Sequence, residues 1–126
     1  MTAITWLLLL GGVALNAAAQ LLLKAATRAS GVLVSDGGQI SWSAAAELLR
    51  AAPLWVGLSF YGVSVILWLG ALSRVPVSIA YPMLSIGYVV NAVAAVFLFS
   101  EALTTAKVAG ILLIVAGVIV LARAAP

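Results

Sequence analysis

The sequence contains no cysteine and no histidine, and it carries only three carboxylates in 126 residues. The missing thiols and imidazoles remove the usual ligands of a zinc site and the groups of Cys-based or Ser-His-Asp catalysis. The carboxylates lie far apart in the sequence, at Asp36, Glu47 and Glu101, so no pair is placed for acid–base work. We therefore expect no enzyme, no metal and no cofactor.

Charge is also scarce, since 7% of the residues are charged and 66% are hydrophobic. A soluble domain carries about a quarter charged residues, and a fold of this length has no means of hiding so much apolar surface from water. The bilayer must therefore be the solvent. The net charge of +3 comes without a basic run interleaved with aromatics, so no nucleic-acid partner is expected.

Four apolar stretches are long enough to cross a membrane, because about 20 residues at 1.5 Å each span the hydrocarbon core. We predict an all-α integral membrane protein, with residues 1–126 forming one domain and helices at about 4–23, 53–72, 77–99 and 106–122. The first stretch has a rival interpretation as a signal peptide, since Ala17-Ala18-Ala19 resembles a cleavage site. No Lys or Arg precedes it, however, and the rest of the chain is equally apolar, which favours a retained helix.

Residues 24–52 form the long connection, in which glycine and serine indicate turns. A short helix is predicted at its end, with Ser41 or Ser43 as the N-cap. Trp42 and Arg50 suit the headgroup layer, so this helix either lies on the membrane surface or belongs to an ordinary turn.

The sequence also predicts a kink and a helix cap, and its Lys and Arg residues indicate how the chain is oriented in the membrane. Pro82 inside the third stretch predicts a kink, because it removes a backbone hydrogen bond. Thr104 or Thr105 is expected to cap the fourth helix. Lys and Arg specify the orientation only weakly, with Lys24, Arg28, Arg50 and Lys107 on one side and Arg74 and Arg123 on the other.

The first helix carries a polar stripe, because Gly12, Asn16, Gln20 and Lys24 follow one another at intervals of four residues. Asn16 and Gln20 either face a ligand cavity or hold helices together by hydrogen bonds. Lys24 either extends to the membrane surface or binds an anion such as a phosphate.

The second and third helices also carry polar and aromatic faces. These faces consist of Tyr61, Ser64 and Trp68 in the second helix and of Ser78, Tyr81, Ser85 and Tyr88 in the third. Asn91 falls about 80° off the latter face. Tyr and Trp offer flat apolar surface, a hydrogen bond and an attraction for cations, so the faces suit an amphipathic or cationic ligand. The alternative is plain helix packing.

The fourth helix has no strongly polar side chain between Lys107 and Arg123. Gly110 and Gly117 share one face, and small residues let helices approach closely, so we interpret this helix as a dimerisation helix; a plain lipid-facing helix is the alternative. Three polar faces from one chain make half a cavity at best. A second chain is expected to supply the other half.

The sequence resembles the small multidrug resistance family of the drug/metabolite transporter superfamily. Within that superfamily it is most similar to the small flippase subunits for aminoarabinose linked to undecaprenyl phosphate. The strongest stretch is Val75-Pro76-Val77-Ser78-Ile79-Ala80-Tyr81-Pro82-Met83-Leu84-Ser85, supported by Ala19-Gln20-Leu21-Leu22-Leu23-Lys24 and Leu54-Trp55-Val56-Gly57-Leu58. The resemblance covers all four helices but not the loop at about 29–51.

The resemblance implies a dimer in the bacterial inner membrane, with two copies inserted in opposite orientations and alternating access to the ligand. In the drug-exporting branch a glutamate of the first helix exchanges protons for cationic drug. This sequence has Asn16 at that position, which carries no proton, and Leu84 stands where the exporters have a tryptophan.

We therefore expect a small transporter or flippase that moves a polyprenyl phosphate-linked aminosugar or a similar amphipathic substrate. Lys24 is expected to pair with the phosphate, aided by Arg28 or Arg74 at the mouth of a groove. The other expected contacts to substrate come from Asn16, Gln20, Tyr61, Ser64, Trp68, Tyr81, Ser85 and Tyr88. The expected partner is a second copy or a paralogue. A cationic drug exporter and a non-transporting membrane subunit are the alternatives.

Overall fold

The computed structural model describes residues 2–125 and is helical almost throughout. Its elements are α1 (Ala3–Ser30), α2 (Trp42–Arg50), α3 (Ala52–Leu72), α4 (Val77–Met83), α5 (Ser85–Leu98) and α6 (Thr105–Ala124). Within the described residues, four helices are long and apolar enough to cross a membrane, with α4 and α5 together forming the third. The prediction of an all-α membrane protein with four spans is confirmed.

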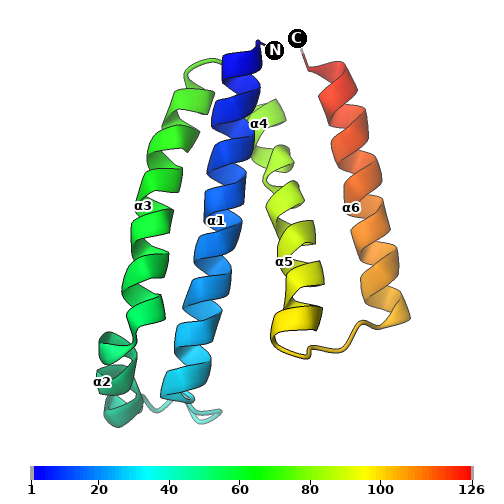
Figure 1. Ribbon diagram of the computed structural model, residues 1–126. Coiled ribbons are helices and arrows are strands. Elements are labelled where there is room, and N and C mark those ends of the chain that lie inside the picture. Colours follow the sequence, from blue (N-terminus) through cyan, green and yellow to red (C-terminus); the bar gives the residue numbers. More distant parts are fainter. Residues whose placement is uncertain (1, 126) are drawn as a thin grey trace.

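The four spans run side by side in alternating directions (Figure 1). Both ends of the chain lie at one end of the bundle, and α2 lies at the other. We call these the terminal end and the α2 end. In the same view α1 stands between α3 and the α4–α5 span, while α6 lies on the outer side of that span.

The closest packing joins α1 to α3 through two glycines. A Cβ placed on Gly12 would lie 3.4 Å from the backbone oxygen of Ser64, and one on Gly57 would lie 3.2 Å from that of Ala19. Backbones that approach this closely gain dispersion contacts, which are the main attraction between helices in lipid. The α1–α3 pair is therefore the most closely packed pair of helices in the bundle.

The first helix ends later than the predicted boundary at residue 23. It continues to Ser30 and stops at Gly31, whose φ of 90° lies in the left-handed region and whose N–H donates to the carbonyl of Thr27. Alanines 25 and 26 favour continuation of the helix, and the first glycine after them ends it. As a result Lys24 lies on a regular helix rather than in a loop.

The connection after α1 makes a tight loop and then a short helix. Val34 and Ile40 form an isolated antiparallel bridge. Ser41 is the N-cap of α2, since its hydroxyl accepts from the N–H of Ala44 at 3.3 Å, and Ser43 lies inside the helix. The indole N–H of Trp55 donates to the carbonyl of Leu49 at 2.8 Å and ties α2 to the start of α3. Placement of α2 on the membrane surface stays a prediction.

The third span is broken where Pro82 predicts a kink. The α-helix ends at Met83 and restarts at Ser85, and Leu84 and Gly87 make shorter i to i+3 hydrogen bonds to Tyr81 and Leu84. The missing N–H of proline accounts for the break. The two halves pack differently: α4 contacts α6 and α3, and its Ala80 and Met83 join Leu9 and Ala71 in the buried core, whereas α5 contacts α1 and α6.

The last helix packs on the outside of the bundle, against α4 and α5. Thr104 caps it, accepting from the N–H of Lys107 at 3.2 Å. None of its described residues is buried, and nothing in the chain lies within 4 Å of a Cβ placed on Gly110 or Gly117. Its predicted role in dimerisation is untested by a single chain and stays a prediction.

Candidate functional site

A groove runs between α1, α3 and the α4–α5 span, and it consists of two cavities that share Asn16 and Tyr61. The cavity nearer the terminal end has a volume of about 240 Å³ and is lined by Gly12, Asn16, Tyr61, Ser64, Val65, Trp68, Tyr81 and Leu84. The cavity nearer the α2 end has a volume of about 350 Å³ and is lined by Asn16, Ala17, Gln20, Tyr61, Gly87, Tyr88 and Asn91. We call them the terminal cavity and the α2-side cavity, and together the central groove.

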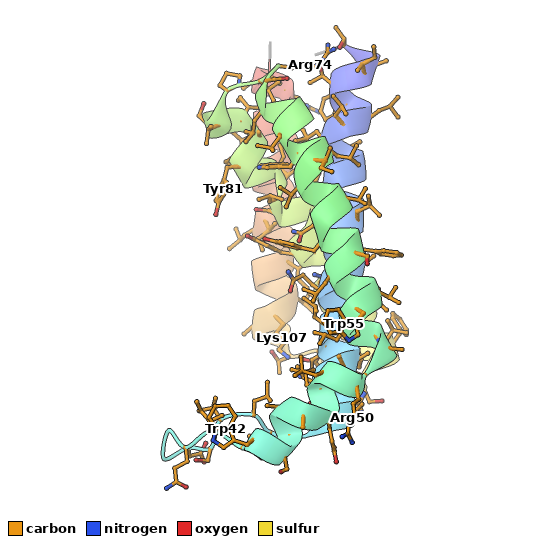
Figure 2. All side chains as sticks on the ribbon, turned by 90° about the vertical axis from the view of Figure 1, so that its left-hand side faces the viewer. Trp42, Arg50, Trp55, Arg74, Tyr81 and Lys107 are labelled. Carbon is orange, nitrogen blue, oxygen red and sulfur yellow. The ribbon has the colours of Figure 1, made fainter. Side chains whose placement is uncertain are left out.

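The groove is open on one side. Tyr61 is 45% exposed, Tyr81 61% and Tyr88 55%, although all three line it. Figure 2 shows Tyr81 projecting from the bundle. Such large aromatic surfaces are left for lipid, ligand or a second chain to cover.

The polar stripe of α1 divides between this groove and the end of the helix. Gly12, Asn16 and Gln20 line the central groove, whereas Lys24 lines a separate cavity one turn further along. That cavity, which we call the basic mouth, has a volume of about 470 Å³ and is lined by Lys24, Thr27, Arg28, Gly31, Val32 and Leu33.

The three residues predicted to face a ligand on α3 are Tyr61, Ser64 and Trp68, and all three line the terminal cavity. Ser64 is buried, and its hydroxyl donates to the carbonyl of Tyr61 at 2.6 Å. Its proton is therefore already used within the helix, and it can serve a ligand only as an acceptor. Tyr61 and Trp68 have no such constraint among the described hydrogen bonds.

The predicted face of the third span is only partly brought to the groove. Tyr81 lines the terminal cavity and Tyr88 the α2-side cavity, while Ser85 lines neither. Asn91, which the helical wheel places off this face, does line the α2-side cavity. The reason is packing: a Cβ on Gly87 would lie 3.3 Å from Cγ1 of Val13, so α5 turns this glycine and its flanks toward α1.

The basic residues are distributed over both ends of the bundle. Arg28 lies near the α2 end with its guanidinium carbon 5.3 Å from the ring centre of Phe99, and it links α1 to the end of the α4–α5 span. Lys107 donates to the carbonyl of Ala102 at 2.7 Å. Arg74 lies at the terminal end, opposite Arg50 and Lys107 (Figure 2). Arg74 therefore cannot share one phosphate with Lys24, and only Arg28 lies beside Lys24 in the basic mouth.

No carboxylate lies in the described membrane spans. Asp36 is in the loop after α1, Glu47 is on α2, and Glu101 is in the connection to α6. The centre of the groove offers amides instead, and the carbonyl oxygens of Asn16 and Asn91 are both buried without a hydrogen-bond partner.

A sequence model of the Small Multidrug Resistance protein family matches residues 37–114. Among curated proteins, a probable 4-amino-4-deoxy-L-arabinose-phosphoundecaprenol flippase subunit ArnE of Enterobacter sp. (strain 638) is 38% identical over 97 residues, which cover 74% of this chain and 91% of the relative. An ArnE subunit of Pseudomonas aeruginosa (strain UCBPP-PA14) is 44% identical over 77 residues, covering 61% and 67%. A subunit ArnF of Erwinia tasmaniensis is 39% identical over 117 residues, covering 89% of each chain. No solved structure matches significantly.

Proposed function

This multi-pass membrane protein belongs to the Small Multidrug Resistance family, and on that premise we propose that it is a flippase subunit for a polyprenyl phosphate-linked aminosugar. The relatives reported above are named as probable subunits of a flippase for such a lipid. The substrate has a charged headgroup and a long apolar tail. A groove open toward lipid can shield the headgroup while the tail stays in the bilayer.

The observation that carries the proposal is the juxtaposition of a basic mouth and an open polar groove on one helix. Lys24 and Arg28 line the mouth, and Gln20, one turn before Lys24, lines the groove. We assign the phosphate to Lys24 and Arg28 as a charge-assisted contact. The sugar then occupies the groove, against Asn16, Gln20, Tyr61 and Tyr88. We further assign Ser64, Trp68 and Tyr81, which line the terminal cavity, to its path toward the terminal end, and Arg74 to a second contact with the phosphate at that end.

A second candidate function is export of cationic drugs, which is favoured by the aromatic lining of the terminal cavity. Tyr61, Trp68 and Tyr81 surround it, and aromatic faces attract cations. Proton exchange requires a titratable group in the membrane, however, and the described spans hold no carboxylate. Growth under a panel of quaternary ammonium compounds separates the two functions. Resistance that is lost in Tyr81→Ala favours export, and no resistance in the wild type removes it.

The functional unit is proposed to contain a second chain, either another copy or a paralogue. Tyr61, Tyr81 and Tyr88 leave one side of the groove open, and α6 presents an unpacked apolar face. We place this assembly in the bacterial inner membrane, because spanning helices are the architecture of that membrane and closed β-barrels that of the outer membrane.

Gly117→Leu is expected to weaken association of α6 with the second chain about tenfold, or about 1.4 kcal/mol, because it fills the space a close helix contact needs. The fold of one chain is unaffected, since nothing lies within 4 Å of the added Cβ. Co-purification of two differently tagged subunits measures the change. Gly62→Leu on α3, where the space is equally open, is the matched control. Unchanged association in Gly117→Leu would remove α6 from the interface.

The proposed activity can be tested in intact cells through the amino group of the substrate. A reagent that reacts with amines and does not cross the inner membrane labels the aminosugar lipid only after it has crossed. We expect labelling when this chain and its partner are present and little labelling when this chain is deleted. Equal labelling in the two strains, with equal total lipid, would contradict the proposal.

A further inference from the structure

The α2-side cavity contains two side-chain amides that come from different spans. Asn16 lies in the middle of α1 and Asn91 in the middle of α5, and both line this cavity. The carbonyl oxygen of each is buried and has no hydrogen-bond partner. Buried polar atoms are nearly always paired, so two orphaned carbonyls at one cavity call for an explanation.

Helical surroundings explain why these oxygens are unpaired. The backbone N–H groups of a helix interior are already used, so a side-chain carbonyl that faces the backbone finds only other acceptors. Turning either amide about its last torsion brings this carbonyl into the cavity, where an entering donor can reach it.

We propose that Asn16 and Asn91 form a recognition site for a hydrogen-bond donor, namely the ammonium group of the aminosugar. Each amide presents its carbonyl when the ammonium enters, and the orphaned oxygens become acceptors of its N–H bonds. The inference rests on the proposed function and specifies which end of the headgroup lies in the α2-side cavity. It also adds Asn91, which the polar stripes of the sequence leave out, to the residues that select the substrate.

The surroundings fit an ammonium better than an anion. Asn16 and Asn91 share the cavity with Tyr61 and Tyr88, whose ring faces attract cations. No positively charged side chain lines it. Two neutral carbonyls and two aromatic rings stabilise a cation without the membrane carboxylate that a proton-exchanging site would hold.

The position of the pair also sets the direction of the headgroup. Asn16 and Lys24 are eight residues apart on α1, which corresponds to about 12 Å of rise along the helix. A sugar phosphate together with the long lysine side chain can cover this separation. The phosphate thus lies at the basic mouth while the amino end of the sugar points into the bundle.

A purely structural role for the amides is less consistent with the packing. Amides that join helices do so by donating and accepting across the contact. Here the α1–α5 contact is made by small apolar groups, as Gly87 lies against Val13 and Ala17. If the amides serve recognition, replacing one by leucine removes an unpaired polar group and does not destabilise the empty protein.

The test uses Asn16→Leu and Asn91→Leu in the assembled protein in lipid nanodiscs, with Val93→Leu on α5 as control, since Val93 lines no described cavity and is 45% exposed. Binding is titrated with three short-chain prenyl phosphates: one linked to the aminosugar, one to its N-acetylated form, and one without sugar. Thermal unfolding is recorded without ligand.

We expect each asparagine variant to bind the aminosugar compound about five- to tenfold more weakly, to bind the sugar-free phosphate as the wild type does, and to unfold at the same or a higher temperature. The wild type should prefer the free amine to the acetylated form, and Val93→Leu should match it. The recognition site would be overturned if the asparagine variants bound all three ligands more weakly by the same factor. It would also be overturned if they unfolded at a lower temperature and kept the wild-type preference among the ligands. Either result would leave the proposed function intact. A wild type that binds none of the three would overturn both.

Discussion

Replacing Lys24 by glutamine is expected to reduce transport of the lipid-linked aminosugar about ten- to a hundredfold. The change removes a charge-assisted contact to the phosphate, which contributes about 1.5–3 kcal/mol. Lys24 is exposed on a regular turn of α1, so the fold is expected to tolerate glutamine. The initial rate of translocation in vesicles, at equal protein content, measures the effect.

Lys107→Gln is the control for this prediction. Lys107 carries the same charge near the same end of the bundle, but it caps the carbonyl of Ala102 and lies outside the basic mouth. Lys24→Arg should retain much of the rate, because a guanidinium also pairs with phosphate. Equal losses in Lys24→Gln and Lys107→Gln would indicate a general effect of surface charge and remove the phosphate contact from Lys24.

Gly57→Leu is expected to prevent normal packing of α1 against α3. A Cβ at Gly57 already lies 3.1 Å from Cβ of Leu22 and 3.2 Å from the backbone oxygen of Ala19, and the rest of a leucine side chain has no room. Forcing extra groups into such a contact costs about 1–3 kcal/mol, and more where the obstacle is backbone. We expect a large fall in the unfolding temperature and in the yield of monodisperse protein.

Gly62→Leu, five residues further along α3, separates packing from helix propensity. Both changes favour the helix equally, but a Cβ at Gly62 has nothing within 4 Å. The unfolding temperature of Gly62→Leu should therefore match or exceed that of the wild type. A Gly57→Leu protein as stable as Gly62→Leu would mean that the α1–α3 contact is looser than the structure has it.

Features with a strong local cause could be predicted from the sequence. Long apolar runs predict the four spans, and Pro82 predicts the break in the third one, because both effects depend on groups within a few residues. The end of α1 could have been found by the same reasoning, since Gly31 is the first glycine after the run. A fall in hydropathy near Lys24 is a weaker indicator of a helix end than a glycine in the left-handed region.

The composition of the groove could be predicted only in part. The stripe on α1 groups Asn16 with Gln20, and both line the α2-side cavity, because one helix face needs no tertiary information. The rotation of α5 depends on Gly87 packing against Val13, a contact between distant parts of the chain. That contact brings Asn91 rather than Ser85 to the groove. The separation of Arg74 from Lys24, by contrast, follows from the order of the spans along the sequence, which already places the two residues on opposite sides of the membrane.

Translocation in a purified system tests the central claim most directly. Vesicles containing the aminosugar lipid in both leaflets are prepared with this chain and its partner, and an impermeant amine reagent is added outside. We expect nearly all of the lipid to become labelled as the inner leaflet is emptied, and we expect Lys24→Gln to slow this markedly. Labelling that stops at the outer-leaflet fraction, with folded and assembled wild-type protein in the vesicles, would contradict the claim.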